Sequence, residues 1–176
     1  MIKKLLPYIG IPIITAGYLL VRANTEGAFT AVKDVQLLGM GYAAAWSDWS
    51  TRKVPNKLVA VMFLLWVLSM AVYVFIDIDS ATAILLPSII GGAAGGGLFV
   101  VLYLVSHKGV GGADVKFITI AGLYLTFVRL MPALFISSLL AALVSAVLLI
   151  TKRATRKSSI PLIPFLYTGI IVTIFI

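Results

Sequence analysis

The chain has 176 residues, of which 61% are hydrophobic and only 11% are charged, and its mean hydropathy is +1.12. Soluble domains are about 45–50% apolar and about 25% charged, so this composition excludes an ordinary water-soluble globular protein. The net charge of +8 fits basic loops beside a membrane better than a nucleic-acid-binding surface.

The apolar residues fall in blocks of membrane-spanning length, which an amphipathic soluble helix would not produce. We therefore predict an all-α, polytopic transmembrane bundle with an N-terminal helix in residues 1–29 and a six-helix membrane core in residues 30–176. Lys33 and Asp34 fall in the first turns of the second block, where Lys33 would extend outward to the membrane interface. In chain order, the predicted spans are Leu5–Val21, Thr30–Ser47, Leu58–Ile76, Ala81–Val105, Val115–Leu130, Ala133–Ile150 and Ile160–Ile176.

The basic residues predict the orientation of these spans. If the N-terminus is cytoplasmic and the chain crosses at every span, 11 of the 14 basic residues face the cytoplasm, and the C-terminus is external. The remaining three are Arg22, Lys33 and Arg129. Of the six acids, only Asp48 and Asp114 then lie on the cytoplasmic side, each at the end of an apolar span. Acids at such depth are functional candidates, because burying their charge is costly.

Asp48 begins a short segment between two predicted spans that contains Arg52, Pro55 and Asn56. Pro55 disfavours helix for the residue before it, and Asn56 is a plausible N-cap for the span that follows. The segment therefore predicts a helix end, a basic loop and a helix start. An alternative role for Asp48 is a simple ion pair with Arg52, one helical turn later.

Asp114 follows a glycine-rich turn, Gly109-Val110-Gly111-Gly112-Ala113, and precedes Lys116. The glycines would let the backbone adopt unusual angles and approach neighbouring groups closely. Alternatives remain open for both charged residues: Asp114 would serve as an N-cap, and Lys116 as an anchor at the membrane interface.

Taken together, the two aspartates point to hydrolysis by a pair of acids. Two carboxylates in a water-poor place tend to share one proton, so that one of them can activate water while the other polarises a carbonyl group. This chemistry needs neither a metal nor a cofactor. The chain has no cysteine, and its single histidine, His107, cannot form a multi-histidine metal site.

Three segments of the chain resemble the type IV prepilin peptidases, which are membrane aspartic proteases of the GxGD type. The first is Asp48 with its basic loop and Pro55-Asn56, and the second is Gly111-Gly112-Ala113-Asp114-Val115-Lys116, similar to the GxGDxK signature. The third runs from Ile160 through Pro161 and Pro164 to Gly169, similar to the proline-rich start of the last helix of the family. Ala113 departs from the pattern, since it occupies the second glycine position.

The resemblance implies a specific activity. It makes Asp48 and Asp114 the catalytic acids, with Lys116 tuning or positioning Asp114. The substrates would be prepilin-like precursors, in which a short basic leader precedes an apolar helix and is removed at the cytoplasmic face of the inner membrane. Residues 22–29 hold no cysteine-bearing domain, so we expect the compact, peptidase-only type found in tight-adherence pilus and archaeal preflagellin systems, without N-methyltransferase activity.

Two other functions remain open from the sequence. One is a non-enzymatic membrane component of a pilus or secretion apparatus, and the other is a small proton-coupled transporter that uses the two aspartates as a relay. The transporter would need acids near the bilayer midplane, whereas these lie at span ends. Beyond the lipid bilayer and a precursor substrate, the sequence indicates no nucleic acid and no oligomer. The spacings Gly91/Gly95 and Gly92/Gly96 predict close helix packing within the bundle.

Overall fold

The computed structural model describes residues 2–22, 27–106, 110–152 and 160–176, and for residues 2–9 it describes the backbone only. All regular structure in these ranges is α-helical, which confirms the predicted fold class. His107 and Gly109 lie outside the described residues, as does most of the basic run that follows residue 151. The helices are α1 (Ile2–Arg22), α2 (Ala28–Thr51), α3 (Asn56–Ile76), α4 (Ile78–Val105), α5 (Gly112–Ile150) and α6 (Ile163–Phe175).

The helices form a membrane bundle. Within the described residues, three of them (α3, α4 and α5) are long and apolar enough to cross a bilayer. Large apolar side chains also cover the outside of the bundle: Phe75 is 91% exposed and Ile150 is 80% exposed. A protein surrounded by water would not expose so much apolar surface. The number of crossings, seven, stays a prediction.

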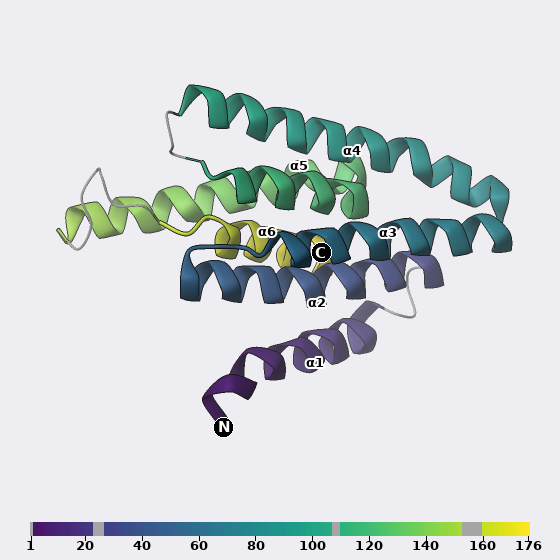
Figure 1. Ribbon diagram of the computed structural model, residues 1–176, viewed down its shortest axis with the longest axis horizontal. Helices are drawn as coiled ribbons and strands as arrows, with labels where there is room; N and C mark the ends of the chain where they lie inside the picture. The colour runs from purple at the N-terminus through teal and green to yellow at the C-terminus, as the bar shows by residue number, and fades with distance from the viewer. Residues whose placement is uncertain (1, 23–26, 107–109, 153–159) are drawn as a thin grey trace.

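Helices α2 to α6 run roughly along one long axis, with α1 oblique to them (Figure 1). The reversal within α5 and the C-terminus lie partway along the bundle (Figure 1). One end, which we call the α2–α3 loop end, contains the last turn of α2 and the first turns of α3, α5 and α6. The other end contains the turn between α3 and α4. There, the hydroxyl and the backbone N–H of Ser80 donate hydrogen bonds that hold the pKa of Asp77 below its ordinary value. Asp77 thereby caps α4.

Helix α5 is interrupted at Thr126, which has φ 63° and ψ 170°, and the chain reverses direction there (Figure 1). The sequence placed this boundary between Leu130 and Ala133, next to Pro132, so the predicted position was wrong by several residues. Pro132 lies inside the second helical segment. A proline there removes one backbone hydrogen bond, which a helix packed against its neighbours tolerates.

The small residues of α4 let it pack closely on α5, as predicted. A Cβ atom on Gly122 of α5 would collide with the backbone of Gly91 and Gly92. One on Gly91 would collide with the Gly122 carbonyl oxygen and with the peptide group that joins Thr126 to Phe127. Backbone, unlike a flexible side chain, cannot easily move aside. The two helices therefore meet at the point where α5 reverses.

The substitution Gly122→Ala is therefore expected to lower the free energy of unfolding by about 1–3 kcal/mol, since it overpacks this contact. Unfolding in mixed detergent–SDS micelles would measure the loss. Gly97→Ala in α4 is the matched control, because a Cβ atom at Gly97 would meet nothing within 4 Å. Equal stability of the two variants would contradict the proposed close contact.

Candidate active site

Asp48 lies in the last turn of α2, on the side that faces the bundle. It continues a row of buried small residues formed by Gly41, Ala44 and Ala45. The helix ends four residues later, where Arg52 adopts the left-handed conformation (φ 55°) and its N–H donates to the Asp48 carbonyl at 2.9 Å. The Asp48 side chain is 8% exposed, and its Oδ2 accepts a hydrogen bond from the N–H of Ile163 at 3.2 Å.

The start of α6 is shaped to make this contact. Ile163 is the first residue of α6, and Pro164 follows it in the first turn, where the missing N–H of proline costs nothing. The free N–H groups and the dipole at a helix N-terminus attract a negative charge. The proline-rich segment predicted from the sequence therefore supplies the donor that orients Asp48. The charge of Arg52 favours the ionised form of Asp48, while the ion pair between the two side chains stays a prediction.

Asp114 is the third residue of α5 and is also buried, at 9% exposed. Its Oδ2 accepts a hydrogen bond from the N–H of Gly111 at 2.9 Å, which is half of a capping box. The carboxylate thus caps the helix from the third position and not as the N-cap itself.

Of the two properties predicted for the glycines of this turn, the described residues show close approach and not an unusual backbone angle. No glycine in the described ranges has a positive φ, and Gly111 is extended at φ −84°. A Cβ atom on Gly111 would lie 3.2 Å from the Asp114 Oδ2. The described part of the turn therefore uses glycine to let the Asp114 side chain approach Gly111, and Ala113 is accommodated at the second glycine position within the helix.

Asp48 and Asp114 come from distant parts of the chain to the α2–α3 loop end, and Asp48 acts electrostatically on Asp114. A further contact joins α5 to α3: the Nζ of Lys116 donates to the Oδ1 of Asn56 at 3.0 Å. Asn56 is therefore not the predicted N-cap. Pro55 is the N-cap of α3, and the side chain of Asn56, the first helical residue, is used by Lys116 instead.

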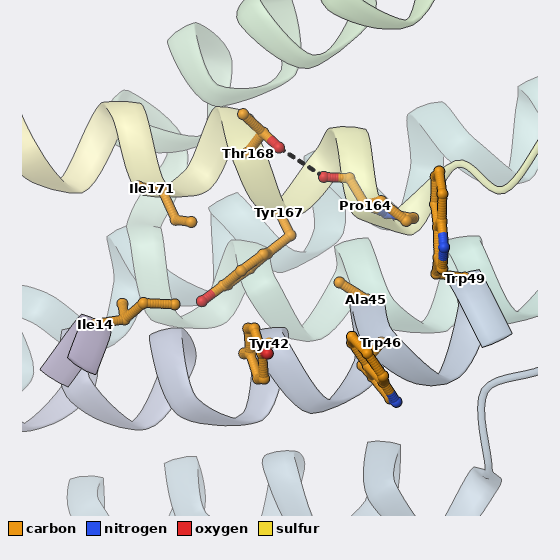
Figure 2. Close-up of a pocket in the computed structure, with 9 residues that line it drawn as sticks. All are labelled: Ile14, Tyr42, Ala45, Trp46, Trp49, Pro164, Tyr167, Thr168 and Ile171. Carbon is orange, nitrogen blue, oxygen red and sulfur yellow. Dashed lines mark hydrogen bonds between the residues drawn. The ribbon is translucent and has the colours of Figure 1, made fainter. Parts of the chain in front are cut away.

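An apolar groove of about 420 Å³ lies between α2 and α6, with Ile14 of α1 also in its lining (Figure 2). Trp49, directly after Asp48, and Pro164, directly after Ile163, line one end of it. We call it the α2–α6 groove. Its lining residues are Ile14, Tyr42, Ala45, Trp46, Trp49, Pro164, Tyr167, Thr168 and Ile171.

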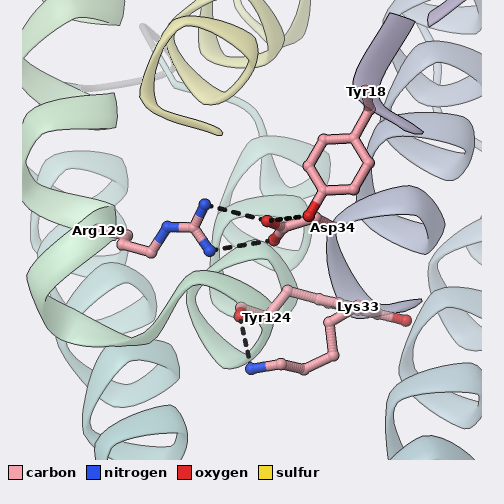
Figure 3. Close-up of polar contacts among 5 residues, drawn as sticks. All are labelled: Tyr18, Lys33, Asp34, Tyr124 and Arg129. Atoms are coloured by element: carbon pink, nitrogen blue, oxygen red, sulfur yellow. Dashed lines mark hydrogen bonds and ion pairs between the residues drawn. The ribbon is translucent and has the colours of Figure 1, made fainter. Parts of the chain in front are cut away.

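A second charged cluster lies deeper in the bundle (Figure 3), and the sequence analysis missed it. Arg129 binds both carboxylate oxygens of Asp34, at 3.2 and 3.0 Å, and the Tyr18 hydroxyl donates to the Asp34 Oδ2 at 3.3 Å. Asp34 is fully buried, whereas it was expected in an external segment. Opposite charges inside two different predicted spans were the signal that could have revealed the pair, because buried charges are found paired.

Lys33 was expected to extend outward, and this expectation was wrong. Lys33 is 4% exposed, and its Nζ donates to the carbonyl oxygen of Tyr124 at 3.3 Å (Figure 3). The break at Thr126 deprives the preceding carbonyl groups of helical donors. The indole N–H of Trp66 satisfies the Leu123 carbonyl in the same way, at 3.0 Å. Lys33 therefore turns inward because the reversal of α5 supplies an acceptor there.

Comparisons with known proteins agree on one family. The type IV leader peptidase family matches residues 35–146, a range that includes both aspartates. A curated relative from Bacillus subtilis (strain 168), the prepilin leader peptidase/N-methyltransferase, is 33% identical over 142 residues. That match covers 80% of this chain and 53% of the relative, so the chain spans about half the length of the curated relative. No solved structure matches the chain.

Proposed function

Because the chain belongs to the type IV leader peptidase family, we propose that it is a membrane-embedded endopeptidase that removes the short leader of prepilin-like precursors. Asp48 and Asp114 are its two catalytic acids. The observation that carries the proposal is their arrangement: two buried carboxylates from distant parts of the chain lie at the same end of a membrane bundle. Burying two acids is costly, and an acid pair that activates water gives a reason for it.

In the proposed reaction, the two acids share one proton. The ionised carboxylate takes a proton from a water molecule, which attacks the carbonyl carbon of the peptide bond, while the protonated acid donates to the carbonyl oxygen. The tetrahedral intermediate then collapses: one of its hydroxyl groups returns a proton to the carboxylate that had donated to the carbonyl oxygen, the C–N bond breaks, and the leaving amine takes the proton that came from water. The pair again holds one proton. The N–H groups of Ile163 and Gly111 hold the two carboxylates in place during these steps.

We also propose that the α2–α3 loop end faces the cytoplasm, with the N-terminus on the same side and the C-terminus external. Among the described residues, Arg52, Lys53, Lys57 and Lys116 cluster near this end, whereas Asp77 lies at the other. Lysine and arginine collect on the cytoplasmic side of membrane proteins. The acid pair would then meet precursors before their leaders cross the membrane.

The experiment that tests the proposal is co-expression of the chain with a panel of prepilin-like precursors. Leader removal would be read as a gel shift, and the new N-terminus would be sequenced. We expect cleavage at one position directly before the apolar helix, and no effect of a metal chelator, because the proposed chemistry uses only acids and water. A chain that inserts normally but cleaves no precursor would leave a non-enzymatic membrane component as the better explanation.

Lys116 is proposed as a positioning residue. It would hold the first turn of α5, and hence Asp114, against α3 through its hydrogen bond to Asn56. Lys116→Met and Asn56→Ala are each expected to lower the cleavage rate several-fold, since an exposed hydrogen bond such as this contributes about 0.5–1.5 kcal/mol. The double variant should cleave no more slowly than either single variant, because the two substitutions remove the same hydrogen bond. Additive losses would show that Lys116 acts independently of Asn56.

A further inference from the structure

The α2–α6 groove has walls with a helical period. Its residues on α2 are spaced at i, i+3, i+4 and i+7, and its residues on α6 repeat the same spacing. Such spacing puts four side chains of each helix on one face. The two faces run along each other for seven residues, which corresponds to about 10 Å, or two helical turns. On α2 the wall is Tyr42, Ala45, Trp46 and Trp49, and on α6 it is Pro164, Tyr167, Thr168 and Ile171.

One end of the groove lies beside Asp48. Asp48 directly precedes Trp49, and its carboxylate accepts a hydrogen bond from the N–H of Ile163, the residue directly before Pro164. Trp46 and Trp49 are 37% and 65% exposed at this end. Tryptophan is favoured at the boundary between a bilayer and water, so this end of the groove suits the place where a membrane helix leaves the lipid.

We propose that the α2–α6 groove holds the first two turns of the apolar helix of a membrane-anchored precursor, which places the peptide bond just before that helix at Asp48 and Asp114. The inference rests on the proposed function and specifies how its substrate is held. The groove is about two helical turns long and is lined mostly by apolar and aromatic side chains, the kind of surface that receives the apolar face of a helix. The peptide bond to be cleaved in a precursor of the proposed kind lies just before its apolar helix, and Asp48 lies at the corresponding end of the groove.

Two other apolar hollows in the described part of the chain fit less well. One, which includes Phe29, Val72 and Ile76, is formed by the first turns of α2 and the last turns of α3, at the end away from the acids. The other lies between α4, α5 and α6 and includes Leu98 and Leu166. It is smaller, at about 280 Å³, and no helix contributes more than three residues to it.

Cysteine cross-linking tests the inference, because the chain has no cysteine of its own. Single cysteines would be placed in the groove (Trp46→Cys and, separately, Thr168→Cys) and in the two other hollows (Val72→Cys and Leu98→Cys). The precursor would carry one cysteine in the second turn of its apolar helix, and the chain would carry Asp114→Asn to prevent turnover. We expect oxidation to join the precursor to the two groove cysteines at least about ten-fold more than to the two others.

Preferential joining to Leu98→Cys or Val72→Cys would overturn the inference, and so would equal joining at all four positions, which would indicate random collision in the membrane. The substitution Thr168→Trp gives a second readout in the otherwise unmodified chain. By filling the groove it should raise KM for the precursor about ten-fold with little change in kcat, whereas Leu98→Trp should leave both unchanged. An unchanged KM for Thr168→Trp would also overturn it.

These outcomes separate the inference from the proposed function. If the parent chain cleaves precursors but the cross-links form elsewhere, only the groove is wrong. If the parent cleaves no precursor, both the proposed function and the proposed role of the groove are wrong.

Discussion

Asp48→Asn and Asp114→Asn are each expected to lower the rate of leader cleavage by about 10²–10⁴-fold, the usual contribution of general acid–base catalysis. Asparagine has nearly the size of aspartate and keeps an oxygen that can accept from the Ile163 or the Gly111 N–H. It cannot exchange a proton with water or with the peptide carbonyl group. The loss should therefore fall on kcat, while KM for the precursor and insertion into the membrane stay close to the parental values.

The matched control is Asp79→Asn, which makes the same chemical change at an exposed acid in the first turn of α4. It should cleave at the parental rate. The double variant of Asp48 and Asp114 should be no slower than either single variant, because residues that act as one unit give non-additive losses. If either single variant kept more than about a tenth of the parental rate, that residue would have no place in an acid pair that works as proposed.

The sequence was a good guide to the elements that carry the candidate site and a poor guide to how they are held. Asp48 and Asp114 were identified from local patterns, because helix ends and turns have strong local signatures, and the proline-rich segment from its resemblance to the family. The contact of Asp48 with the Ile163 N–H could not be found in this way, since it depends on where α6 begins relative to α2. Asn56 shows the same limit: its local pattern predicts an N-cap, but a lysine from α5 engages its side chain.

The interior of the bundle was harder still to predict. Thr126 carries no sequence signal for a reversal, and the nearby Pro132 drew the predicted boundary away from it. Once the reversal is known, the inward orientation of Lys33 and the position of Trp66 follow from the carbonyl groups that it leaves without helical donors. These side chains satisfy a backbone feature that only the folded chain reveals, so composition and hydropathy point to the wrong environment for Lys33.

Asp34→Ala is expected to lower the free energy of unfolding by about 3–5 kcal/mol, because it removes one partner of a buried ion pair. Asp34 is fully buried and joins three helices: Arg129 from α5 and Tyr18 from α1 both bind it on α2 (Figure 3). Without the carboxylate, Arg129 keeps its charge in a largely apolar place. Unfolding in mixed micelles would measure the loss. Tyr18→Phe, which removes only one hydrogen bond to the same carboxylate, is the control and should cost about 1 kcal/mol.

The double variant Asp34→Leu/Arg129→Met should recover most of this loss, since replacing both members of a buried pair with apolar residues is often close to neutral. A loss for Asp34→Ala no greater than that for Tyr18→Phe would contradict a buried pair that holds α1, α2 and α5 together. Asp34 also lies 14 residues before Asp48 on α2, about 21 Å along the helix. The proposed roles are therefore distinct. Variants of Asp34 should lose stability while each folded molecule still cleaves at the parental rate. Variants of Asp48 should keep the parental stability and lose cleavage.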